Sequence, residues 1–189
     1  RLLAHIDAIR AAEAKIGGIR LLAGSEVDIH ADGSLDYDDE LLARLDLVIA
    51  SPHASLRQEP ATATARLLAA VRHPLVHCIG HPTGRIINGR PGLEPDMPAI
   101  IAAARECGTA LEINANHLRL DLRDAHVRMA VDAGVTIAIN CDVHGEGDFN
   151  ELRYGVMTAR RGWLPRSLCI NTWERDAIEG WLRAKRKTP

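Results

Sequence analysis

Apolar runs alternate along the chain with segments of helical periodicity. The apolar runs predict five strands, over 19–29, 47–53, 75–85, 109–116 and 136–140. Apolar residues spaced three or four apart predict helices over 1–18, 36–45, 62–73, 96–108, 121–135, 150–162 and 172–186. Apolar strands separated by helices are typical of a parallel sheet with helices packed on it. The pattern therefore predicts an α/β fold with about five parallel strands.

Composition narrows the classes of protein that fit this pattern. The 189 residues suit one domain, and 3% aromatic content requires a core of Leu, Ile, Val and Ala. A net charge of -2 gives no overall attraction to nucleic acid or membranes. No apolar run approaches the roughly 18 residues of a membrane span, so no membrane partner is expected. Widely spaced cysteines without a secretion signal predict buried thiols and a cytoplasmic location.

Polar or ionisable residues lie at or just beyond the carboxyl end of every predicted strand. In order along the chain they are Glu26 and Asp28, His53, His81 and Arg85, Glu112, Asn114 and Asn116, and Asp142 and His144. The carboxyl ends of parallel strands meet at one edge, where α/β proteins place their chemistry. Histidines and carboxylates that converge there would form a nitrogen and oxygen site for Zn²⁺, Mn²⁺ or Fe²⁺. Without cysteine ligands, a catalytic site is favoured over a structural one. The alternative is that each histidine is a hydrogen-bonded loop residue.

Two features of these strand ends suggest further roles. Asp142 and His144 are two residues apart, so a strand that continued through them would place both side chains on one face. Arg85 closes the glycine-containing loop 80–85 and is a candidate phosphate clamp, or else an ion-pair partner of a nearby acid. Asn114, Asn116 and Arg119 are the other candidates for substrate binding.

Seven motifs reveal a resemblance to a known family. They are AGSEVDI, LDLVIASPHASL, CIGHPTGR, ALEINAN, RLDL, INCDVH and RYGVMTARRGW, in that order over nearly the whole chain. Together they closely resemble the PHP (polymerase and histidinol phosphatase) domain of bacterial and archaeal family X DNA polymerases. The resemblance implies a distorted, TIM-like barrel of seven strands with a trinuclear metal centre at its carboxyl-terminal mouth. It also implies an Mn²⁺- or Zn²⁺-dependent 3′-5′ exonuclease that processes DNA ends in repair.

The resemblance also implies roles for individual residues. Glu26 would bridge two metals, and His53 and His81 would complete the second metal. Asp142 would bind the first metal and His144 the third. Hydrolysis would proceed by attack of a metal-held hydroxide on phosphorus, with Arg85 on the phosphate. Because the sequence suggests no aromatic platform at the mouth, we expect DNA to be held chiefly through its phosphates.

The sequence departs from the family pattern at its beginning. The family starts with a strand ending in His-x-His and a second strand ending in Asp-His, and nothing before Glu26 matches these. We therefore expect residues 1–189 to form a single, N-terminally incomplete PHP domain, without an upstream polymerase domain. It would have at most one well-liganded metal site and weak or no activity alone. Its open strand edge at 21–29 would be covered by missing barrel strands or another chain.

Two alternatives to the exonuclease remain. One is a small-molecule phosphatase of the histidinol-phosphatase type, which would use the same metals on a phosphomonoester. The other is a PHP domain kept as a non-catalytic scaffold.

Overall fold

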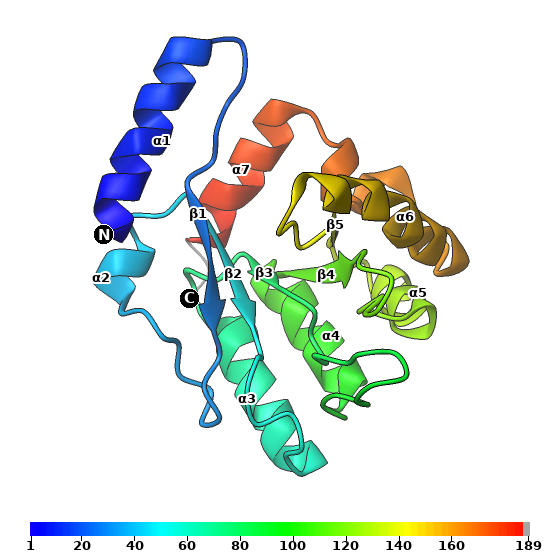
Figure 1. The fold of residues 1–189 in the computed structure, drawn as a ribbon. Coiled ribbons are helices and arrows are strands. Elements are labelled where there is room, and N and C mark those ends of the chain that lie inside the picture. Colours follow the sequence, from blue (N-terminus) through cyan, green and yellow to red (C-terminus); the bar gives the residue numbers. More distant parts are fainter. Residues whose placement is uncertain (187–189) are drawn as a thin grey trace.

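The computed structural model describes residues 1–186 and contains one sheet of five parallel strands (Figure 1). The strands are β1 (Gly24–Asp28), β2 (Leu47–Ser51), β3 (Cys78–Ile79), β4 (Ala110–Asn114) and β5 (Ile137–Asn140). They pair in their order along the chain, each parallel to the next. This confirms the predicted α/β fold, and the sequential order is consistent with part of a TIM-like barrel.

The helices fall where the periodicity predicts them. They are α1 (Leu2–Ile16), α2 (Asp39–Leu42), α3 (Pro60–Arg72), α4 (Met97–Cys107), α5 (Asp124–Asp132), α6 (Leu152–Arg161) and α7 (Arg175–Lys185). Short 3₁₀ helices follow β5: η1 (Glu146–Glu151), η2 (Arg166–Leu168) and η3 (Ile170–Thr172). The predicted strands at 19–29 and 75–85 are shorter than expected. The second ends at Ile79 because His81 adopts a left-handed backbone conformation, with φ of 23°.

The sheet separates two environments. One face carries Val48, Ile79, Leu111 and Ile137, which pack into the main core with residues of the helices such as Leu67. We call the other side the site face; it carries Glu26, Ile49, Cys78, Ala110, Glu112, Asn114, Ala138 and Asn140. Near the amino ends of the strands this face is apolar, since Cys78, Ala110 and Ala138 cluster with Ile49, Ile170 and Trp181. Near the carboxyl ends it is polar, which places the candidate site there.

The β1 edge of the sheet is open among the described residues, as expected. β1 pairs only with β2, and α1 and α2 lie on this side of the molecule (Figure 1). Gly24, Glu26 and Asp28 are exposed along the edge, and two of these three residues are acidic. What covers this edge stays a prediction. The four cysteines are free and buried, as predicted, and none of the described helices could span a bilayer.

We predict that stability falls in mild acid because of two partly or fully buried histidines. Burial lowers the pKa of both His77 and His126 from 6.5 to about 4. The unfolded chain therefore binds more protons than the folded chain between about pH 6.5 and 4, and stability is lost as the pH falls through this window. The free energy of unfolding, measured in urea, should be lower at pH 5 than at pH 7.

The variant His126→Gln isolates this effect from groups that titrate in the opposite sense, such as His53. Its loss of stability between pH 7 and pH 5 should be smaller than that of the natural sequence. An equal loss in both proteins would show that His126 does not carry the predicted effect.

Candidate metal centre

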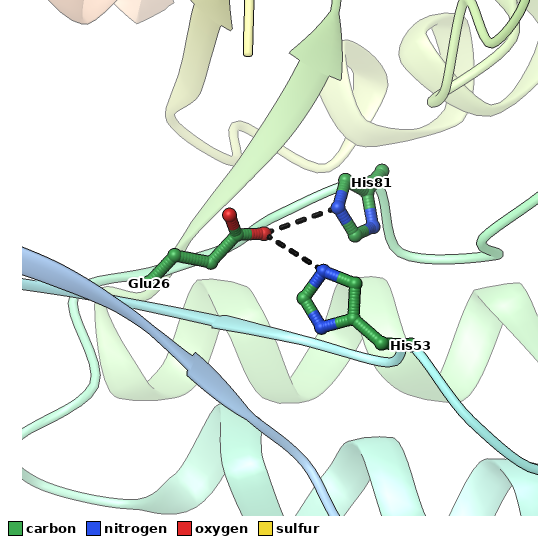
Figure 2. Close-up of side chains that lie close together, drawn as sticks. All are labelled: Glu26, His53 and His81. Atoms are coloured by element: carbon green, nitrogen blue, oxygen red, sulfur yellow. Dashed lines mark ion pairs between the residues drawn. The ribbon is translucent and has the colours of Figure 1, made fainter. Parts of the chain in front are cut away.

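Three adjacent strands bring Glu26, His53 and His81 together. Glu26 lies in the middle of β1, and each histidine lies two residues past the end of its strand, β2 or β3. The strand register pairs Glu26 with Ile49 and Ile49 with Cys78. The side chains of Glu26, His53 and His81 therefore reach the same part of the site face. Figure 2 shows both imidazole rings turned toward the Glu26 carboxylate.

The distances within this group suit a shared cation. Glu26 Oε1 lies 3.4 Å from His53 Nε2 and 3.1 Å from His81 Nε2 (Figure 2). The two rings are edge to face, with centroids 5.0 Å apart. One ligand atom from each residue lies within 4.8 Å of the other two. Two imidazole nitrogens and one carboxylate oxygen match the ligand types of Zn²⁺ and Mn²⁺.

Burial and charge support the same conclusion. His81 is only 1% exposed, and neither ring nitrogen has a hydrogen-bond partner of good geometry among the described residues. A bound cation would satisfy a nitrogen that is otherwise costly to bury. The nearby imidazoles of His53 and His81, together with the Ser51 hydroxyl, hold the pKa of Glu26 well below its ordinary value. Glu26 is therefore an anionic ligand at neutral pH.

His53 is oriented by a second carboxylate. Its Nδ1 lies 2.5 Å from Asp28 Oδ1, which leaves Nε2 facing Glu26. Hydrogen bonds with Glu26 and Asp28 raise the pKa of His53, while burial opposes them. An imidazole held by a carboxylate on one nitrogen while the other faces the ion is the usual arrangement around metal-binding histidines.

Glu112 fixes the backbone of His81. The His81 N–H donates to Glu112 Oε2 at 2.6 Å, and Asn140 Nδ2 donates to Glu112 Oε1 at 2.8 Å. Burial raises the pKa of Glu112 to about 7. The preceding Gly80 is required because a Cβ atom there would lie 2.3 Å from Ser51 Oγ. From the sequence alone, Glu112 was one of several polar residues at a strand end, and nothing there indicated that it holds the loop of His81.

Two residues that the sequence analysis did not single out also hold the ligand loops. Asp121 Oδ2 accepts three hydrogen bonds of 2.9 Å, from Thr83 N, Thr83 Oγ1 and Gly84 N. The buried guanidinium of Arg66 donates to the carbonyls of Ile29 and Ala54. It thereby joins the end of β1 to the loop that carries His53. The only sequence signal was the position of Asp121 within the RLDL motif.

Asp142 and His144 form a second cluster. The argument that strand periodicity puts both on one face is wrong, because β5 ends at Asn140 and Asp142 has φ of 54°. They are nevertheless neighbours, with 3.7 Å between His144 Nδ1 and Asp142 Oδ1. The Asp142 carboxylate lies 3.2 Å from Asn114 Nδ2 and 3.6 Å from Arg119 Nε. The His144 side chain is 81% exposed. Their roles as metal ligands stay predictions.

The candidate substrate-binding residues mostly shape the loop after β4. Arg85 donates to the carbonyls of Arg119 and Leu120, so its hydrogen-bond partners among residues 1–186 are backbone groups and not an acid. Asn114 Oδ1 accepts from Asn116 N, and Asn116 Oδ1 accepts from Leu118 N. Substrate contacts by Arg85, Asn114, Asn116 and Arg119 stay predictions.

The sequence suggested no aromatic platform at the mouth, but aromatic side chains do lie near the loops of the second cluster. His117 and Tyr154 pack with their ring centroids 6.1 Å apart, next to the loops of the second cluster. Phe149 is exposed and lies on η1, the 3₁₀ helix that follows the loop of His144. The sequence analysis missed the contact between His117 and Tyr154 because these residues are far apart along the chain and meet only in the folded structure.

A parallel α/β sheet with a carboxylate and two histidines at the carboxyl ends of its strands defines a protein with a candidate catalytic metal centre. Comparison with known proteins identifies the family. The chain is 42% identical over 183 residues to the DNA polymerase/3′-5′ exonuclease PolX of Bacillus subtilis (strain 168), covering 97% of this chain and 32% of PolX. It belongs to the family that its motifs predict, the PHP domains found in family X DNA polymerases.

Other relatives are named as phosphatases. The chain is 29% identical over 184 residues to a probable phosphatase of Thermoanaerobacter sp. (strain X514), covering 92% of this chain and 72% of that protein. It is 35% identical over 166 residues to a probable phosphatase of Caldicellulosiruptor saccharolyticus, covering 83% of this chain and 66% of that protein. The chain thus spans about a third of PolX and about two thirds or more of these phosphatases. No protein-family profile matches it.

We predict that metal binding depends on the three-residue group. The variants His81→Ala and Glu26→Gln should each bind Mn²⁺ and Zn²⁺ at least about tenfold more weakly, since the first removes a ligand nitrogen and the second removes the negative charge of the carboxylate ligand. Isothermal titration calorimetry on the metal-free protein measures this. His30→Ala is the control, because His30 faces Asp36, 3.6 Å away, outside the group. Unchanged affinity in both ligand variants would contradict the site.

We also predict a loss of metal affinity when the support for His53 is removed. Asp28→Ala frees the His53 ring to rotate, and metal affinity should fall about 10- to 100-fold. Asp28→Asn keeps a hydrogen-bond acceptor and should recover part of the loss. Asp32→Asn is the matched control, because Asp32 bonds only Ser34 within its own turn. The hypothesis fails if Asp28→Ala and Asp32→Asn bind metal equally well.

Proposed function

We propose that this chain is a metal-dependent phosphoesterase that cleaves phosphodiester bonds at the 3′ ends of DNA, as a 3′-5′ exonuclease. The observation that carries the proposal is the group of Glu26, His53 and His81, in a chain of which 97% aligns with an exonuclease-bearing polymerase. We further propose that it acts in DNA repair in the cytoplasm, together with the polymerase part of a parent protein.

The residues suit Mn²⁺ or Zn²⁺, and a bound ion would neutralise charge on the phosphoryl oxygens and activate water. Glu26 supplies a permanent negative charge, and His53 and His81 supply nitrogen lone pairs once His53 has lost its proton. Asp142 and His144 are the candidates for holding further ions. Arg119, beside Asp142, is placed to contact a phosphate that approaches this cluster.

A small-molecule phosphatase is the second candidate. It is favoured by one observation, that the chain spans 72% of a relative named a probable phosphatase. The same ligands would then act on a phosphomonoester.

Comparing two substrates in the purified protein tests the proposal. With Mn²⁺, we expect slow shortening of a 5′-labelled oligonucleotide from its 3′ end, in keeping with the weak activity expected of residues 1–189 alone, and still slower turnover of p-nitrophenyl phosphate. EDTA should stop both reactions. Glu26→Gln should slow both at least about tenfold, an effect of about 1.4 kcal/mol on the barrier.

The other outcomes separate the alternatives. Turnover of the monoester without DNA shortening would favour the phosphatase. Metal binding without hydrolysis of either substrate would favour a non-catalytic scaffold. His30→Ala, which leaves the metal group intact, should retain full activity.

A further inference from the structure

Phe149 is exposed beside the second cluster. It is the one phenylalanine of the chain and is 68% exposed, although aromatic residues make up only 3% of the sequence. Hydrogen bonds hold its segment against the loop of Asp142 and His144. Asp148 Oδ2 accepts 2.8 Å hydrogen bonds from His144 N and Gly145 N, and the Phe149 carbonyl lies 3.9 Å from Cys141 Sγ.

A second group of planar side chains, His117, Tyr154 and Arg153, lies at the loop after β4 and at helix α6. The rings of His117 and Tyr154 are 6.1 Å apart, and the Arg153 guanidinium lies 4.7 Å from the Tyr154 ring centroid. Glu151 fixes His117 in place. Glu151 Oε2 accepts a 2.8 Å hydrogen bond from the backbone N–H of His117 and lies 2.8 Å from His117 Nδ1. We call His117, Phe149, Arg153 and Tyr154 the aromatic rim.

The rim residues follow strands that are hydrogen-bonded to the support of the candidate metal centre. β4 and β5 pair at Asn114 and Asn140, and the rim residues follow these two strands. Asn114 contacts Asp142, and Asn140 contacts Glu112, which holds His81. Exposed ring faces accompanied by arginines are the surfaces on which unpaired nucleobases stack, whereas a base-paired duplex presents no free ring face along its length.

We propose that the aromatic rim binds unpaired nucleobases of a nucleic-acid strand whose phosphates approach the metal centre, with Phe149 as the principal stacking residue. The proposal rests on the function proposed above and narrows its substrate to single-stranded ends. An apolar contact with another protein would use the same exposed ring without needing its flat face, and this difference can be tested.

The experiment measures binding of a fluorescent single-stranded oligonucleotide by anisotropy, with EDTA present so that cleavage does not interfere. Phe149→Ala should weaken binding about 5- to 100-fold, the range expected for one lost base stack. Phe149→Trp should keep near-natural affinity, and Phe149→Leu should behave like Phe149→Ala. Because no phosphate contact is lost, the slope of log affinity against log salt should not change. Trp163→Ala is the control, since Trp163 is 74% exposed and lies near Arg128, away from the rim.

A second probe isolates the bases from the phosphates. An oligonucleotide of abasic nucleotides keeps every phosphate, so Phe149→Ala should bind it as the natural sequence does. Equal affinity of Phe149→Ala and the natural sequence for the normal oligonucleotide would overturn the proposal. So would full rescue by Phe149→Leu, or no oligonucleotide binding at all. Loss of binding in Phe149→Ala together with no Mn²⁺-dependent cleavage would instead refute the proposed function and leave the rim as a binding surface.

Discussion

The geometry of the candidate metal centre depends on the buried carboxylate of Glu112. It joins three strands, because Glu112 belongs to β4 and accepts from the backbone after β3 and from Asn140 of β5. A buried carboxylate is costly unless its oxygens are hydrogen-bonded, so alternatives to this arrangement are strongly disfavoured. The His81 N–H is thereby directed toward β4, and the left-handed turn that follows swings the imidazole toward Glu26.

Arg66 and Asp121 hold the neighbouring loops in the same way, through hydrogen bonds between a buried charged side chain and the loop backbone. Each is a buried charged group satisfied largely by backbone atoms of a segment that carries or adjoins a ligand. Such contacts contribute little net stability, but they leave the loops few other conformations. The ligand atoms of Glu26, His53 and His81 are consequently held close together, as a preorganised site requires.

Sequence patterns predicted the parts of this structure that follow from local periodicity. The five strands, their parallel order and the approach of Glu26, His53 and His81 all follow from apolar runs that end in polar residues. The pattern could not locate Arg66 or Asp121, since their roles arise from contacts between loops far apart in the chain. It also misjudged Asp142, because a single left-handed residue breaks the period of two on which the prediction relied.

The two clusters at the mouth differ in how readily each can accept a cation. Around Glu26 the neighbouring bases are histidines, whose neutral imidazole nitrogens are metal ligands. Beside Asp142 lies Arg119, whose guanidinium keeps its charge at any physiological pH and repels an arriving ion. A cation at Asp142 therefore requires Arg119 to move away or a phosphate to lie between them. This asymmetry favours occupation of the Glu26 group first and couples the second position to the presence of a phosphorylated substrate.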